Sequence, residues 1–162
     1  NSSQGDFNFL KILKEMGAEI NYEEGLISVK KSTLKGVRCS MKEMPDQVPT
    51  LAVLALFADT PTEIYDIDYL KYKESDRISS LCIELSKLGV QIYYSDGALT
   101  VHPLVSAPQK ATLHTFQDHR LVMAFSVLTS MFPQITITDK QCVAKSFPDF
   151  FTELDKLKPL SQ

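Results

Sequence analysis

The feature that most limits how this chain can fold is an internal repeat. Residues 16–29 return as residues 88–101, and Gly17 falls on Gly89, so the two copies are offset by 72 positions. The same offset, without a gap, relates further pairs along the chain: Gly25 and Gly97, Met44-Pro45-Asp46 and Phe116-Gln117-Asp118, and Lys73 and Lys145. Chance similarity rarely keeps one offset through four separate blocks, so we interpret the chain as a duplicated unit of about 72 residues.

Both copies predict the same order of helices and strands. Apolar residues at helical spacing precede Gly17 and Gly89, and a glycine suits the left-handed end of a helix. Alternation of period 2 on either side of residues 23–25 and 95–97 predicts a hairpin with a glycine turn. A strand, a second helix and a last strand follow, near 37–40, 47–58 and 62–67 in the first copy and near 110–114, 119–131 and 134–138 in the second.

The repeat also predicts the domain organisation. We expect an α/β (α+β) fold with one unit at residues 1–72, a second at 73–144 and the start of a third at 145–162, opened by a helix near 148–157. Two units and a start indicate a truncated domain of three units. Its open sheet edge and its uncovered apolar faces favour self-association. Those faces are Phe9-Leu10-Leu13 at one end and Phe150-Phe151-Leu154 at the other.

Composition narrows the class of protein. Apolar residues make up 44% of the chain, which is enough for a packed core. The 17 Lys+Arg against 20 Asp+Glu give a net charge of -3, which argues against nucleic acid or an anionic membrane as a partner. The longest unbroken apolar run, 51–58, is far short of the ~20 residues that span a bilayer.

The start of the chain and its cysteines suggest a cytoplasmic protein. The first five residues have no basic head before an apolar stretch, so we expect no signal peptide, and the missing initiator Met indicates an internal cut in a longer protein. Cys39, Cys82 and Cys142 are odd in number, widely spaced and without a CxxC pair. We interpret them as reduced, partly buried thiols rather than disulfide partners or metal ligands.

Basic residues gather at three predicted helix starts. These clusters are Lys73-Glu74-Ser75-Asp76-Arg77, Asp118-His119-Arg120 and Lys145-Ser146-Phe147-Pro148. With Ser75 as the expected N-cap, Arg77 falls in a first turn, where a cation opposes the helix dipole by roughly 0.3–1 kcal/mol. Free backbone N–H groups and basic side chains together make an anion site, whereas the plain alternative for each cluster is a solvated, capped helix start.

Some of the polar residues have ordinary structural explanations. Asp46 precedes a helix with Pro49 in its first turn, which is the usual setting of an N-cap. His119 in a first turn is more often a surface residue than a catalytic one. We interpret His102 and His114 as structural, because the sequence offers neither of them a partner.

Taken together, the motifs resemble one enzyme family. They are Gln4-Gly5-Asp6, Met44-Pro45-Asp46, Lys73-Glu74-Ser75-Asp76-Arg77, Asp118-His119-Arg120 and Ala144-Lys145-Ser146-Phe147-Pro148-Asp149. In this order, with the repeat between them, they are similar to those of the 5-enolpyruvylshikimate-3-phosphate synthases, the 3-phosphoshikimate 1-carboxyvinyltransferases. The resemblance spans essentially the whole chain but only the C-terminal part of the family's length.

The resemblance implies a fold and a reaction. It implies two similar domains, each of three βαβαββ-type units of the enolpyruvyl transferase fold, that close around substrate. The enolpyruvyl group of phosphoenolpyruvate moves to the 5-hydroxyl of shikimate 3-phosphate and phosphate is released, on the way to chorismate and the aromatic amino acids. No metal or organic cofactor is implied. The N-terminal domain of the same protein is the implied partner, so we expect this fragment alone to be inactive.

The resemblance also implies catalytic residues. Adding a hydroxyl to an enol ether carbon needs a base for the hydroxyl and an acid for the methylene carbon. Asp46 contacts the shikimate hydroxyls and is the implied base. Glu74 is the implied proton donor, with Lys73 as a second candidate for the proton transfer.

The substrate-binding residues follow from the same resemblance. Lys73 is placed on the hydroxyl side of shikimate, and Arg77, Arg120 and Lys145 hold phosphoenolpyruvate. Asp118 and His119 line the site, and His119 is a candidate for orienting substrate or shuttling a proton.

Two alternatives stay open at this point. One is the related transferase that moves enolpyruvyl to UDP-N-acetylglucosamine, in which we do not expect the motifs at 73–77 and 118–120. The other is a non-catalytic binding module whose basic clusters are ordinary helix starts. Titration with phosphoenolpyruvate, with and without shikimate 3-phosphate, separates an enzyme from such a module.

Overall fold

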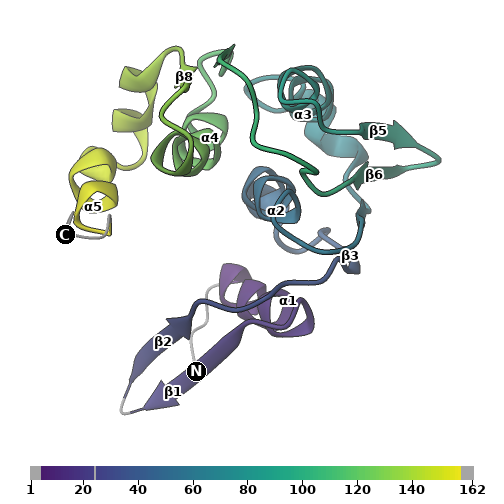
Figure 1. Cartoon of the computed structure of the whole chain (residues 1–162), viewed down its shortest axis with the longest axis vertical. Coiled ribbons are helices and arrows are strands. Elements are labelled where there is room, and N and C mark those ends of the chain that lie inside the picture. The colour runs from purple at the N-terminus through teal and green to yellow at the C-terminus, as the bar shows by residue number, and fades with distance from the viewer. Residues whose placement is uncertain (1–4, 24, 158–162) are drawn as a thin grey trace.

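The computed structural model describes residues 5–23 and 25–157, so Gln4 of the first motif lies outside the described residues. In Figure 1 the elements follow an arc, from the hairpin β1–β2 at the bottom, past α2 and α3, to α5 at the left. The first copy of the repeat contains η1 (Gly5–Asn8), α1 (Phe9–Glu15), β1 (Glu19–Glu23), β2 (Leu26–Lys30), β3 (Arg38–Ser40), η2 (Pro45–Gln47), α2 (Val48–Ala55), β4 (Thr62–Tyr65) and η3 (Asp68–Tyr72).

The second copy repeats this order. It contains α3 (Arg77–Ser86), β5 (Ile92–Ser95), β6 (Ala98–Val101), β7 (Ala111–Leu113), α4 (His119–Met131) and β8 (Ile135–Ile137), and η4 (Lys140–Lys145) and α5 (Phe150–Lys156) follow. Every helix and strand predicted for the two copies is therefore confirmed. The helices α1 and α3 end where expected, since Gly17 and Gly89 have φ of 101° and 79°, which a side chain would strain.

One sheet joins the two copies. Its strand order is β3-β4-β6-β5, with β3 and β4 parallel and the other neighbours antiparallel. The central pair aligns Ile64 of β4 with Leu99 of β6, and both side chains are fully buried. The last strands of the first copy thus pair with the hairpin of the second. The hairpin β1–β2 and the parallel pair β7–β8 form two separate two-stranded sheets.

The core lies between the helices and the four-stranded sheet. The helix α2 is apolar on nearly all sides and packs against α4, the equivalent helix of the second copy. Phe125 of α4, Leu51 of α2 and Met16 after α1 are fully buried in one continuous cluster. This packing holds the N-terminal ends of α2 and α4 close to each other.

The structure corrects some local predictions. The N-cap of α3 is Asp76 rather than Ser75, because Asp76 accepts the backbone N–H of Ser79 at 3.0 Å whereas the Ser75 hydroxyl donates to Asp118 at 3.1 Å. The last helix starts at Phe150, two residues after Pro148. The short helices η3 and η4 were not predicted from the sequence pattern.

In the part of the chain that the structure describes, all three cysteines are free. Cys39 is buried, and burial raises the pKa of its thiol to about 11, so it stays protonated at neutral pH. Among the described helices, none has the length and apolar character that crossing a bilayer requires.

Candidate functional site

Arg77 lies at the centre of the charged cluster. It is the first residue of α3 and is only 1% exposed. Its Nε donates to Asp118 Oδ2 at 2.7 Å, its Nη1 to Asp46 Oδ1 at 2.9 Å and its Nη2 to Glu74 Oε2 at 2.9 Å. Burial lowers the pKa of Arg77, but Asp118, Asp46 and Glu74 raise it by more, so that it lies above its ordinary value. The guanidinium is therefore a permanent cation. Arg77 therefore holds three carboxylates in fixed positions.

The repeat explains why two of these carboxylates meet. Asp46 and Asp118 are equivalent residues in the two copies, and each lies just before the helix, α2 or α4, that its copy contributes to the core. Because α2 and α4 pack together, the two aspartates approach the same guanidinium from different copies. The site is thus built at the starts of α2, α3 and α4, where α2 packs against α4.

Asp118 is fully buried, and its carboxylate accepts hydrogen bonds from the backbone as well as from Arg77. Its Oδ1 accepts the N–H of Arg120 at 2.9 Å, which caps α4, and its Oδ2 also accepts the Ser75 hydroxyl. The two residues before it, Phe116 and Gln117, have φ of 52° and 56°. Residues other than glycine rarely adopt this left-handed backbone conformation, which costs of order 1–3 kcal/mol per residue. Packing must therefore hold the segment in place.

Asp46 is half-buried and faces three cations. Besides Arg77, Arg120 Nη2 donates to its Oδ2 at 3.1 Å, and Lys73 Nζ lies 3.9 Å from its Oδ1. Burial raises the pKa of Asp46, but the hydrogen bond from Arg77 and the charges of Arg120, Arg77 and Lys73 lower it below its ordinary value overall. Among residues 5–23 and 25–157, the N-cap positions of η2 and α2 are Met44 and Gln47, neither with a side-chain cap, so Asp46 is not the N-cap that the plain structural explanation expects.

Arg120 and Lys73 are the accessible cations of this cluster. Their side chains are 27% and 34% exposed, against 1% for Arg77. The Nε of Arg120 is buried, and no acceptor for it occurs in the part of the chain that the structure describes. An unsatisfied buried donor costs about 1–3 kcal/mol, which favours a rearrangement of this side chain when an acceptor arrives.

An open hollow lies beside Glu74. It has a volume of about 640 Å³ and is lined by Glu74, His114, Phe116, Gln117 and Asp139. His114, interpreted from the sequence as structural, therefore borders the candidate site, although it lies four residues before the motif Asp118-His119-Arg120. Nothing in the sequence around His114 signals this position, and the left-handed backbone of Phe116 and Gln117, which also line the hollow, is not marked by a glycine either.

The remaining predicted residues are placed less centrally. His119 is the first residue of α4 and is 9% exposed, so it is buried rather than a surface residue. Lys145 is exposed at the end of η4, and its amine makes no hydrogen bond or ion pair with residues 5–23 or 25–157. Arg77 and Arg120 thus converge on one carboxylate, whereas no contact brings Lys145 to it.

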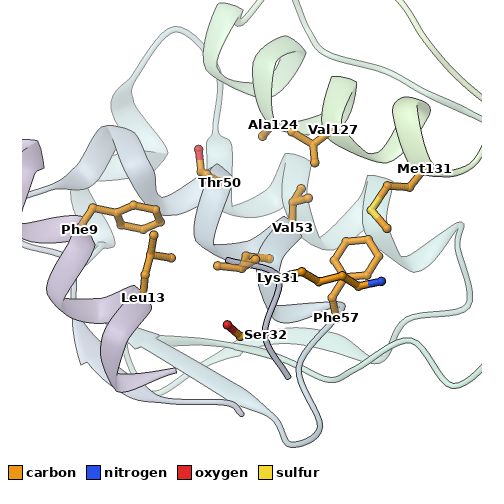
Figure 2. Close-up of a pocket in the computed structure, with 11 residues that line it drawn as sticks. Phe9, Leu13, Lys31, Ser32, Thr50, Val53, Phe57, Ala124, Val127 and Met131 are labelled. Atoms are coloured by element: carbon orange, nitrogen blue, oxygen red, sulfur yellow. The ribbon is translucent and has the colours of Figure 1, made fainter. Parts of the chain in front are cut away.

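A second hollow is apolar and separate from the charged cluster. It has a volume of about 510 Å³ and is lined mainly by α1, α2 and α4. In Figure 2, Phe9 and Leu13 of α1 face Val53 of α2 across it, with Val127 and Met131 of α4 on its far side. Its lining offers no pair of acid and base groups, so we do not regard it as a catalytic site.

The fold and the site define the class of protein to which this chain belongs. Its repeated α/β units match those of the enolpyruvyl transferase NikO from Streptomyces tendae with a TM-score of 0.67, over 93% of this chain and 35% of the other. At 19% identity this likeness concerns the fold alone. The fold is therefore that of the enolpyruvyl transferases.

Sequence comparisons assign the chain to a narrower group than the fold does. The family profile of EPSP synthase (3-phosphoshikimate 1-carboxyvinyltransferase) matches residues 1–154, and the chain belongs to this family. A solved EPSP synthase from Acinetobacter baumannii has a TM-score of 0.75 at 27% identity, over 94% of this chain and 38% of that one.

Curated relatives support the same family. A 3-phosphoshikimate 1-carboxyvinyltransferase from Haemophilus ducreyi is 38% identical over 97% of this chain and 36% of its own length. One from Aeromonas salmonicida is 39% identical over 99% of this chain and 37% of its own length. The chain thus spans a little over a third of the length of the relatives that it matches.

Proposed function

We propose that this chain is part of an enzyme that transfers the enolpyruvyl group of phosphoenolpyruvate to the 5-hydroxyl of shikimate 3-phosphate and releases phosphate. The observation that carries the proposal is the convergence of Lys73, Arg77 and Arg120 on Asp46, in a chain of the EPSP synthase family. Both substrates are anions, and a cluster of fixed cations favours them. The matched relatives carry this activity in their names, which favours shikimate 3-phosphate over a UDP-amino sugar as acceptor.

The anion of phosphoenolpyruvate binds, in this proposal, where Asp46 now lies. The Asp46 carboxylate occupies Arg120 Nη2 and Arg77 Nη1 as an internal anion would. A phosphate or carboxylate group from the ligand takes these donors by displacing Asp46, with Lys73 adding a third charge. Arg77 keeps its bonds to Asp118 and Glu74 during the exchange and so remains a fixed support.

Displacement prepares Asp46 to act as the base. While Arg77, Arg120 and Lys73 surround it, the pKa of the Asp46 carboxyl lies below its ordinary value despite burial, which makes it a weak base. Once Arg120 and Arg77 are neutralised by the ligand, the pKa of Asp46 moves back up and the carboxylate turns to the acceptor hydroxyl. Addition of the hydroxyl, with protonation of the methylene carbon, gives a tetrahedral adduct. Its elimination returns one proton of the new methyl group to the group that supplied it and releases phosphate, whose departure the same cations assist.

Protonation of the methylene carbon falls to Glu74 or Lys73. Glu74 is held by Arg77 Nη2 and also borders the open hollow, so it is fixed in position and accessible from solvent. Lys73 is accessible too, at 34% exposure. Lys145 and His119 are assigned by the resemblance, to phosphoenolpyruvate binding and to lining the site. We infer no metal or organic cofactor for this chemistry.

The sheet arrangement supports a domain of three repeat units, the first two at 1–72 and 73–144. The strand β4 pairs with β6, and the repeat equivalents of these strands are β8 and β2. Within residues 5–23 and 25–157, neither β8 nor β2 has the partner that this rule assigns. A third unit would supply both partners, and it would also cover the apolar hollow between α1, α2 and α4. We also propose that the N-terminal domain of the same protein is the partner of this chain, and that the protein is cytoplasmic.

A chimera tests the proposed activity. In the Haemophilus ducreyi relative, the matching 158 residues are replaced by this chain, and phosphate release is followed with phosphoenolpyruvate and shikimate 3-phosphate. We expect turnover that needs both substrates and that falls at least 100-fold with Asp46→Asn, the usual scale of general-base catalysis. Turnover of UDP-N-acetylglucosamine instead, or binding of phosphoenolpyruvate by a folded chimera without any turnover, would overturn the proposal.

A further inference from the structure

The buried face of α3 carries two charged residues. Arg77 and Glu84 are seven positions apart, so they lie on the same side of the helix, and each is only 1% exposed. Arg77 bonds Asp118, whereas Glu84 Oε2 accepts the backbone N–H of His114 at 2.8 Å. The segment 114–118 is therefore attached to α3 at both of its ends.

We propose that Glu84 is a positioning residue, which fixes the segment 114–118 and thereby places Asp118 and Arg120. It touches neither of these side chains. It acts through the backbone of His114, four residues before Asp118. This inference deepens the proposed function and rests on it for the kinetic part of the test.

The surroundings of Glu84 show that its carboxylate is held for this contact. The Lys87 ammonium donates to the same Oε2 and also reaches the Thr112 carbonyl at 3.5 Å. Burying a carboxylate is costly unless it is paired and hydrogen-bonded, and a negative charge near the C-terminal end of a helix opposes the helix dipole. Such a residue is unfavourable for α3 itself, so its contribution lies in what it binds.

The repeat supplies an internal comparison. The position of the first copy that corresponds to Glu84 is Ile12, which is buried in the apolar core of α1. The position that corresponds to Arg77 is Gly5. The same helix can therefore pack with an apolar residue at this point. The carboxylate occurs only in the copy whose next segment bends through two left-handed residues.

That bend explains why an attachment is needed. Phe116 and Gln117 hold strained backbone conformations, and strained residues persist only where the surroundings fix them. On the side away from α3, the Thr115 hydroxyl donates to the Thr138 carbonyl at 3.1 Å, and the Thr115 N–H donates to Thr138 Oγ1 at 3.1 Å. Glu84 supplies the opposite attachment, so its loss lets the segment relax and shifts the cap of α4.

The test compares three variants of the whole protein that carries this chain. Glu84→Leu removes the acceptor, Glu84→Gln keeps an oxygen for His114, and Ile12→Ala disturbs the equivalent core position without touching the segment. Hydrogen exchange of peptides covering residues 110–120, the melting temperature, and kcat and KM for phosphoenolpyruvate are measured. We expect Glu84→Leu to exchange at least about tenfold faster and to raise KM for phosphoenolpyruvate about tenfold.

The control variants decide between positioning and plain stability. Glu84→Gln should stay within about twofold of the unaltered protein in both readouts, and Ile12→Ala should lower the melting temperature without changing either. If Glu84→Leu does not fold, Glu84→Asp, one methylene shorter, takes its place. The inference is overturned if Glu84→Leu exchanges no faster than Ile12→Ala at the same loss of melting temperature. It is also overturned if Glu84→Leu exchanges faster but keeps an unchanged KM. If the unaltered protein does not turn over the two substrates, the proposed function is wrong instead. The exchange data then still decide the role of Glu84.

Discussion

The side chains of Arg77 and Asp118 form a 2.7 Å hydrogen bond in which both partners are buried. One residue opens α3 and the other caps α4, so this bond joins the helix starts of the second repeat unit. A buried pair of this kind is costly to break, because the remaining charge has no water to replace its partner. The bond therefore stabilises the fold and the site together.

Replacing Arg77 should destabilise the chain strongly. Arg77→Met leaves Asp118 as an unpaired buried charge, and we expect the free energy of unfolding to fall by about 3–5 kcal/mol in urea denaturation. Arg38 is a matched control, since it also bonds a carboxylate, Glu63, at 2.8 Å but is 68% exposed. Arg38→Met should change the free energy of unfolding far less, because an exposed ion pair contributes little to stability. Equal losses for the two variants would show that Arg77 is not the central support we describe.

Removing the internal anion should strengthen the binding of external ones. Asp46→Asn takes a negative charge away from Arg120 and Lys73, so inorganic phosphate and phosphoenolpyruvate should bind about fivefold more tightly, equivalent to about 1 kcal/mol. Calorimetric titration measures this. Asp59→Asn, at an exposed position outside the cluster, should leave the affinity unchanged. Weaker binding by Asp46→Asn would mean that Asp46 does not compete with the ligand.

The stability of the chain should depend on Asp46 at acid pH. The cations around Asp46 hold its folded pKa below the value of an unfolded aspartate, about 3.9. Its contribution is therefore fully present above the unfolded pKa and is lost as pH falls through the lowered, folded pKa. Melting temperatures from pH 6 down to pH 2 should fall less steeply in Asp46→Asn than in the unaltered chain. Parallel curves would show that the surrounding cations do not stabilise the ionised form.

The sequence predicted the elements well because their signals are local. The bounds of α4, 119–131, follow from apolar periodicity and from Asp118 before the helix, and Gly17 and Gly89 mark two helix ends directly. Signals that compete within a few residues were harder to resolve. Ser75 and Asp76 are both good N-caps, and the choice between them depends on Asp118, 43 residues from Ser75.

The candidate site was predicted as a set of residues but not as a geometry. The motifs identified Asp46, Arg77 and Arg120, yet the bonds that join them span 31 and 74 positions, which no periodicity encodes. The sequence also suggested that Arg77 faces a ligand, whereas its guanidinium lies buried among three carboxylates. The left-handed bend at 116–117 contains no glycine, so nothing signalled the hollow beside it.

The uncovered edges of the sheets should control how the isolated chain associates. By the rule that pairs β4 with β6, the strand β8 is suited to pair antiparallel with β2. The strand β2 is exposed along its whole length, with Leu26 and Val29 at 76% and 56% exposure. The apolar faces predicted at the two ends are only half-buried, as at Phe9 and Phe151. Open edges with apolar side chains favour association between copies.

We therefore expect the 162-residue chain to self-associate at micromolar concentration through β2 of one copy and β8 of another. Sedimentation velocity over a concentration series measures this association. Val29→Lys puts a charge on the exposed edge and should weaken the association at least tenfold, because an edge lysine blocks strand addition. Val105→Lys is the control, since Val105 is 93% exposed and lies in the loop between β6 and β7, outside both strands. A monomer whose melting temperature is independent of concentration would mean that the two units close on themselves, and that no third unit is missing.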